Sequence, residues 1–153
     1  MKKYIFFILI VLALFYSSGQ TYEEQSLIPD LQHYLPNEPL KGMLSMFQIP
    51  YWGITVSVEE RGYHAFIEFL LRKGAHVFIF GALAAAIYYA IRKFTLAFVI
   101  TVALAFIDEF HQSLTGGRTP TIHDVMLDSF GAMVALFLIF LIKKFKSRKK
   151  KSS

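Results

Sequence analysis

Three apolar segments of this chain carry no charged side chain, and each meets basic residues at one end and other polar residues at the opposite end. A helix rises about 1.5 Å per residue, so segments of 14 or 15 residues cover roughly 21–22 Å. The hydrocarbon core of a bilayer is nearer ~30 Å thick. Three helices that span a bilayer would therefore hold the polar residues at its edge, where ionisable groups are costly and usually functional or mutually paired. The segments are Val77–Ile91, Phe94–Ile107 and Ser129–Ile142.

The composition is that of a membrane protein. Of the 153 residues, 55% are hydrophobic and the mean hydropathy is +0.46, whereas soluble domains average about 45–50% apolar residues. The excess is gathered in long runs, which predicts a single all-α membrane domain over residues 1–153. The chain has no cysteine, which excludes disulfides and thiolate metal sites. Its net charge of +5 would suggest nucleic-acid binding if the basic residues formed a folded patch. Their placement follows membrane topology instead, so we expect no nucleic-acid partner.

The positions of Lys and Arg predict the orientation, since both residues favour the cytoplasmic side. Eleven of the sixteen lie in three places: Lys2 and Lys3 at the start, Arg92 and Lys93 between two apolar segments, and seven more after Ile142. All 11 acidic residues fall in or beside the segments on the other side. We therefore expect a multi-pass helical bundle in the plasma membrane with both termini in the cytoplasm. Its four expected spans are residues 4–19, 65–91, 94–112 and 124–142, with an outer loop over 20–64 and a cytoplasmic basic tail over 143–153.

The first span and the outer loop leave alternatives open. Tyr4–Phe15 is apolar, follows a basic start and precedes small residues, a layout shared by a first helix and a secretory signal peptide. We expect an uncleaved helix, with cleavage as the alternative. Four prolines rule out one continuous helix over residues 21–60. The moderately apolar stretch Leu40–Val58 is either an interfacial or re-entrant segment or a loop packed on the outer ends of the helices.

Polar residues from three expected helices and one turn collect at the outer edge of the membrane. Cations and carboxylates at a low-dielectric boundary cannot all stay isolated and charged, so some must pair. Lys73–Asp108 and Arg118–Asp128 are candidate pairs, although the sequence does not select the partners. A purely structural ion-pair network is the alternative, but buried pairs stabilise poorly against apolar packing, and we prefer a site open to the outside. The candidate ligand-binding residues are Lys73, His76, Asp108, Glu109, Gln112, Arg118, Asp124 and Asp128.

The spacing assigns several residues to particular helix faces. Asp108 and Gln112 are four residues apart and share one side of the third helix. Asp124 is placed to cap or open the fourth helix, where a carboxylate suits the positive end of the dipole. Gly81 and the alanines beside it predict a face of the second helix that lets a neighbouring helix approach closely.

Among the histidines, His76 is the site candidate. It shares a helix face with Glu68 and Arg72 and could act as a ligand, proton carrier or hydrogen-bond donor. We expect His111 and His123, which flank the turn, to be interface residues. A zinc site built from these three histidines and a carboxylate can be written down, but no HExxH pattern supports it. We therefore expect no metal and no cofactor, and the sequence has no nucleophile elbow or phosphate-binding glycine loop.

Four stretches at these positions resemble the VanZ-like family of small bacterial integral membrane proteins. They follow its order of K-x-x-H, D-E-x-x-Q, an Arg and a final D-x-x-x-[NS]-x-x-G, with Asp128 standing where many members have Asn. The resemblance is firm over Leu71–Phe137 and looser before it. It implies a bacterial cell-envelope protein linked to low-level resistance to teicoplanin-type glycopeptides, and it carries no established enzymatic activity, metal or cofactor. The stretches are Leu71–Phe80 (LRKGAHVFIF), Ile107–Gln112 (IDEFHQ), the Gly117–Arg118 turn and Asp124–Ala132 (DVMLDSFGA).

Three functions remain in competition. We favour a binding protein whose outward-facing polar pocket holds a lipid-linked envelope intermediate or an amphiphilic glycopeptide, with membrane lipids around it. The first alternative is an intramembrane enzyme acting on a lipid-linked substrate, with Glu109 or Asp108 as general base and His76 as its acid partner. The second is a structural or partner-binding helix bundle. The residues expected to hold a headgroup are Lys73, His76, Gln112 and Arg118.

Overall fold

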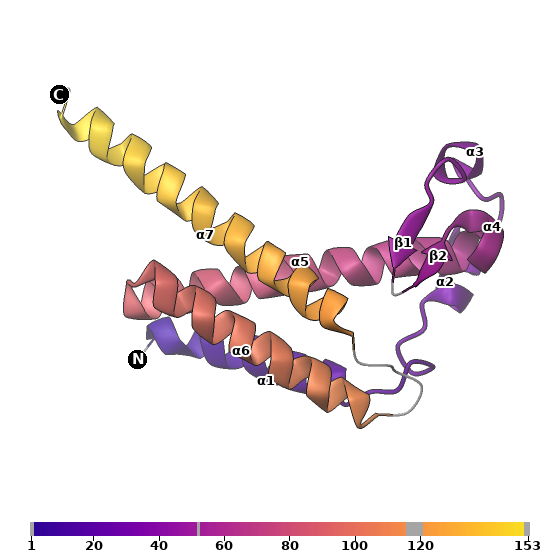
Figure 1. Cartoon of the computed structure of the whole chain (residues 1–153), viewed down its shortest axis with the longest axis horizontal. Coiled ribbons are helices and arrows are strands. Elements are labelled where there is room, and N and C mark those ends of the chain that lie inside the picture. The colour runs from indigo at the N-terminus through magenta and orange to yellow at the C-terminus, as the bar shows by residue number, and fades with distance from the viewer. Residues whose placement is uncertain (1, 52, 116–120, 152–153) are drawn as a thin grey trace.

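Four long helices dominate the computed structural model, which describes every residue except 1, 52, 116–120 and 152–153. Short helices and one hairpin fill the segment between the first and second of them (Figure 1). The prediction of an all-α protein is thus confirmed. The long helices are α1 (Lys2–Ser18), α5 (Tyr63–Ile91), α6 (Phe94–Ser113) and α7 (Ile122–Lys151).

The helices α5, α6 and α7 are each long and apolar enough to cross a membrane. The helix α1 is also apolar but shorter, over Ile5–Ser18. At about 1.5 Å per residue, the 29 residues of α5 extend roughly 43 Å, so α5 exceeds the ~30 Å hydrocarbon core by several turns. This chain is therefore a membrane protein, while a fourth span at α1 stays a prediction.

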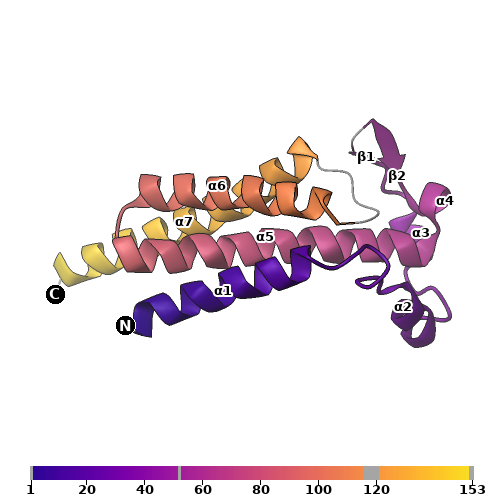
Figure 2. The same cartoon turned by 90° about the horizontal axis from the view of Figure 1, so that it is seen from below.

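The bundle is built around α5, which packs against α7, α6 and α1 (Figures 1 and 2). The crossing of α5 and α7 is unusually close. A Cβ added at Gly131 would overlap the backbone of Val77, and one added at Gly81 would lie 3.1 Å from the Gly131 carbonyl oxygen. Only glycine at these positions lets the two backbones approach so closely, as small-residue faces do in membrane bundles.

The apolar core extends along the bundle from Val125 of α7 to the end where α5 turns into α6. Phe80, Leu83 and Tyr88 are fully buried there. The rings of Tyr88 and Phe94 stack with centroids 4.2 Å apart, and the Lys143 ammonium group donates a 2.6 Å hydrogen bond to the Tyr88 hydroxyl. These contacts fasten the basic end of α7 to the α5–α6 turn and leave the opposite end of the bundle polar.

The outer segment folds into short elements that pack on the start of α5. Its small apolar core joins Val56 and Val58 to Tyr63 and Phe66, which are all buried. The described residues of Leu40–Val58 form a helical turn and a hairpin, and the position of this segment relative to the membrane stays a prediction. The elements are α2 (Ile28–Tyr34), α3 (Lys41–Leu44), β1 (Ile49–Tyr51), β2 (Ile54–Val56) and α4 (Val58–Arg61).

The helices α5 and α7 extend beyond the membrane spans expected for them. The helix α5 begins at Tyr63, directly after Gly62, whose φ of 81° is readily adopted only by glycine. The helix α7 begins at Ile122 and continues to Lys151, well past the expected end of the span at residue 142. Lysine and arginine are good helix formers, and no glycine or proline follows residue 142, so the basic tail continues the helix.

Candidate functional site

One large cavity, of about 640 Å³, opens between α1, α5 and α6 at the polar end of the bundle. Its wall is completed by the start of α7 and by side chains of the outer loop. The volume falls in the range of roughly 300–1,000 Å³ typical of small-molecule sites. Six of the eight candidate residues line it: Lys73, His76, Asp108, Glu109, Gln112 and Asp124.

The other two candidates do not line the cavity in the described part of the chain. Asp128 lies behind His76, and its side chain is only 2% exposed. Arg118 lies outside the described residues, as does most of the turn that carries it. The candidate pair of Arg118 with Asp128 therefore stays a prediction. Among the described residues, Asp128 pairs with His76.

Lys73 pairs with Asp124 rather than with Asp108, the partner suggested by the sequence. The Tyr51 hydroxyl of β1 donates a hydrogen bond to the same carboxylate, and the Lys73 ammonium lies 4.7 Å from the centre of the Tyr51 ring. Burial raises the pKa of the Tyr51 phenol, and the negative charge of Asp124 raises it further. This group joins α5, α7 and the outer hairpin.

The start of α7 is fixed by a reciprocal cap. The Thr121 hydroxyl donates to the Asp124 carboxylate at 3.0 Å and accepts a hydrogen bond from the Asp124 backbone N–H at 3.2 Å. The Thr121 backbone N–H donates to Glu109 of α6 at 2.6 Å. Thr121 is thus the capping residue, and Asp124, expected to cap or open the helix, lies within its first turn.

His76 is held in one orientation by a buried carboxylate. Its Nδ1 lies 3.2 Å from an Asp128 oxygen, and its ring stacks on Phe80 with centroids 6.1 Å apart. A carboxylate partner at Nδ1 fixes the tautomer of an imidazole and directs its other nitrogen elsewhere. Because His76 also lines the cavity, its Nε2 atom is the nitrogen available to a ligand.

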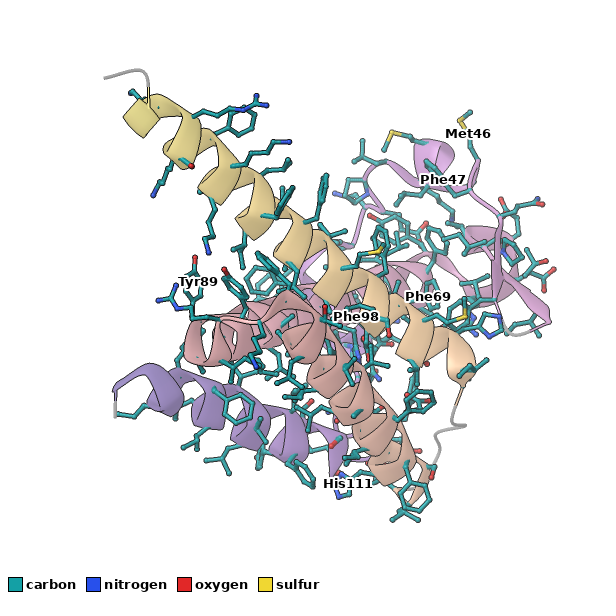
Figure 3. The ribbon with its side chains drawn as sticks, turned by 60° about the vertical axis from the view of Figure 1, so that its left-hand side comes forward. Met46, Phe47, Phe69, Tyr89, Phe98 and His111 are labelled. Carbon is teal, nitrogen blue, oxygen red and sulfur yellow. The ribbon has the colours of Figure 1, made fainter. Side chains whose placement is uncertain are left out.

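The end of α1 is tied to α6 by buried polar contacts. The Ser18 hydroxyl is 2.8 Å from His111 Nδ1, and the His111 ring lies 5.0 Å from the Phe15 ring. Figure 3 shows His111 where the ends of α6 and α1 meet. The next residue of α6, Gln112, donates from its side-chain amide to Asp108, one turn earlier, at 2.7 Å. His111 is therefore a helix-interface residue, as the sequence indicated.

Glu68 is a site residue that the candidate set omitted. Its side chain is 1% exposed and accepts hydrogen bonds from the Leu27 backbone N–H at 2.8 Å and the Tyr22 hydroxyl at 3.2 Å. Arg72 lies 3.3 Å away as its ion-pair partner. Burial raises the pKa of the Tyr22 phenol, and the Glu68 charge adds to the shift. The four-residue spacing of Glu68, Arg72 and His76 was the available signal.

No group of three or more His, Asp or Glu side chains is arranged to hold a metal ion within the described residues. The three histidines of the zinc site considered from the sequence make separate contacts. His76 faces Asp128, His111 faces Ser18, and His123 lies with its ring centre 5.7 Å from that of Tyr51. The polar chemistry of the described cavity is that of carboxylates, two amides, an imidazole, hydroxyl groups and three cations.

The fold and the cavity define a helical membrane protein with a polar site at one end of its bundle. Residues 4–143 match the VanZ/LLP1 family, and the chain belongs to this family. The identification made from the four motif stretches is thereby confirmed, and the match also covers α1 and the outer loop. No curated protein and no solved structure matches the chain.

Proposed function

We propose that this protein binds an amphiphilic ligand, a lipid-linked envelope intermediate or a teicoplanin-type glycopeptide, in a cavity that opens to the outer side of the bacterial plasma membrane. In this proposal α1 is a fourth span and both termini lie in the cytoplasm. The side chains around a bound headgroup include Lys73, His76 and Gln112. Through such binding the protein would contribute to glycopeptide resistance.

The observation that carries this proposal is the two-part lining of the cavity. Its outer part holds charged and amide groups from α5, α6 and α7, and its inner part is lined by apolar side chains of α1 and α5. A ligand that matches both parts needs a polar headgroup and a hydrocarbon portion. Charge-assisted hydrogen bonds in a partly desolvated site favour oxyanion or amide groups over water.

The proposal predicts that loss of polar lining weakens ligand binding. His76→Ala and Glu109→Ala each remove a polar side chain that would hydrogen-bond the headgroup. Each variant is expected to bind teicoplanin about 10-fold to 100-fold more weakly. Binding is measured on the purified protein in nanodiscs, with the deacylated glycopeptide core as a second ligand. The core is expected to bind more weakly because it lacks the hydrocarbon portion.

Matched controls come from the exposed outer loop. His33→Ala and Glu23→Ala remove the same residue types at exposed positions that do not line the cavity, so both should bind teicoplanin as the original protein does. If folded His76→Ala and Glu109→Ala proteins bind like these controls and give full resistance in cells, ligand binding at this site is contradicted. A structural or partner-binding bundle would then be the better account.

A second function, catalysis on a lipid-linked substrate, is favoured by the pairing of His76 with buried Asp128. An imidazole oriented by a carboxylate and facing a cavity can move protons. Glu109 or Asp108 would then act as general base and His76 as its acid partner. Catalysis would be indicated if His76→Ala retained ligand binding but lost resistance, whereas parallel loss of both indicates recognition alone.

A further inference from the structure

We propose that the apolar part of this cavity is a site for one hydrocarbon chain, and that its depth selects the length of that chain. The inference rests on the proposed function, because the headgroup of the same ligand would occupy the polar part. It goes further by assigning a separate role to α1 and to the part of α5 that follows His76. Neither segment contains a candidate site residue.

The wall formed by α1 is a continuous apolar stripe. Phe6, Ile10, Ala13 and Leu14 line the cavity, and their spacing of three and four residues places them on one helix face. The stripe leads up to Ser18 at the polar end. From Ser18 to Phe6 is twelve residues, or roughly 18 Å at 1.5 Å per residue. This length suits an extended hydrocarbon chain lying parallel to α1.

The facing wall is the part of α5 that follows His76. Phe78, Ile79 and Ala82 line the cavity there. No described residue of α5 beyond Ala82, and none of α1 before Phe6, contributes to the lining. The two walls therefore stop within the bundle, well before α5 ends at Ile91. A cavity that stops inside the membrane gives a bound chain a defined depth.

The cavity is reached from the side as well as from the polar end. Phe78 is 77% exposed and Phe6 is 58% exposed, although both line the cavity. In a bilayer these surfaces would face lipid, so a chain already inserted in the outer leaflet could enter between α1 and α5 without crossing water.

The charges at the outer end favour a headgroup that carries both signs. Lys73 and Asp124 form one pair, and Arg72 and Glu68 form another, both at the cavity wall. Glu109 also lines the wall, and its acceptor contact is with a backbone N–H. A phosphate with an attached ammonium group complements such alternating charges. Single-chain phosphoethanolamine lipids therefore serve as probes of the inference.

The test is a competition among lysophosphatidylethanolamines of graded acyl length for the purified protein, read by native mass spectrometry. We expect occupancy to peak at an intermediate length, because a short chain leaves the groove unfilled and a long one must bend out of it.

Filling the floor of the groove should move this peak. Ala82→Leu shortens the space, so its peak is expected to shift to chains shorter by about two or three methylenes, the length of the added side chain. Ala13→Leu narrows the groove from the α1 side and supplies a second variant should the first fail to fold. Ala103→Leu is the matched control, since Ala103 is exposed on α6 and does not line the cavity; its peak should not move.

The outcomes separate this inference from the function on which it rests. If the lysolipids bind with no length preference, or the peak stays in place in both filling variants, chain selection is overturned while headgroup binding stands. If no lysolipid binds the original protein, chain selection is overturned. If His76→Ala binds the lysolipids as well as the original protein does, headgroup binding at His76 is contradicted, and the filling variants alone decide chain selection. A peak that moves equally in Ala103→Leu would also overturn the inference, because the shift would then not report the groove.

Discussion

At the scale of single residues, Glu68 is a buried carboxylate that holds the outer loop against α5. It is almost fully buried, accepts hydrogen bonds from the Leu27 backbone N–H and the Tyr22 phenol of the outer loop, and forms an ion pair with Arg72 of α5. The Nε atom of Arg72 is buried without a hydrogen-bond partner among the described residues. Glu68 and the Tyr22 carbonyl, which accepts a hydrogen bond from Arg72, therefore offset the partial burial of this cation. Glu68 also joins Tyr22 and Leu27 to the bundle.

Removal of this carboxylate should detach the outer loop. We expect Glu68→Ala to lower the free energy of unfolding by about 3 kcal/mol, since it leaves a partly buried charge and a backbone donor unpaired. Limited proteolysis should cut the segment around Leu27 faster, and an SDS unfolding titration measures the loss. Glu23→Ala, at an exposed position, is expected to change neither. Equal protease resistance of Glu68→Ala and Glu23→Ala would contradict the role given to Glu68.

The sequence predicted which residue types meet at the site better than which atoms pair. Lys73 was assigned to the polar layer, but its partner depends on how α5 and α7 are rotated about their axes. This rotation places Asp124 rather than Asp108 beside the Lys73 ammonium group. The contact between Tyr51 and Asp124 joins residues 73 positions apart and has no local sequence signal.

At the scale of elements, the close crossing of α5 and α7 decides the geometry of the site. Gly131 lies against the backbone of Val77, the residue that follows His76 on α5. One turn earlier on α7, Asp128 reaches His76. A wider separation of the two helices would lengthen this contact and the Lys73–Asp124 pair together, so helix packing and site geometry are coupled.

A methyl group at the crossing should therefore be costly. We expect Gly131→Ala to destabilise the protein by about 1–3 kcal/mol, because its Cβ would overlap the Val77 backbone. Gly74→Ala is the matched control, since a Cβ at Gly74 meets nothing within 4 Å. Alanine is the better helix former, so this control should stabilise the protein by about 0.5–1 kcal/mol. Thermal unfolding of both variants in detergent distinguishes them, and equal midpoints would contradict the close crossing.

The long helices were predictable and the outer elements were not, for a physical reason. Uncharged runs of 14 and 15 residues leave few alternatives to a buried helix, and glycines mark where helices meet. The hairpin has strands of only three residues, and Pro50 within the first strand argues against a strand. Its stability comes from packing of Val56 and Val58 on α5, a tertiary contact that no short sequence window contains.

At the scale of the whole molecule, polarity is divided between the two ends of the bundle. One end holds the cavity, the paired charges and the folded outer segment (Figure 1). The other holds the α5–α6 turn and the basic end of α7, which extends away from the bundle. Basic residues favour the cytoplasmic side and anionic lipids of the inner leaflet. This division is the physical basis for proposing that the cavity faces outward.

Thiol labelling of two single-cysteine proteins tests this orientation most directly, because the chain has no cysteine of its own. Thr115→Cys places the thiol at the end of α6 near the cavity, and Ser147→Cys places it on the basic end of α7. With a membrane-impermeant maleimide on intact cells, the account predicts labelling at position 115 and none at 147, with the reverse in inside-out vesicles. Labelling of 147 but not 115 on intact cells, or of both from one side, would contradict an outward-facing cavity.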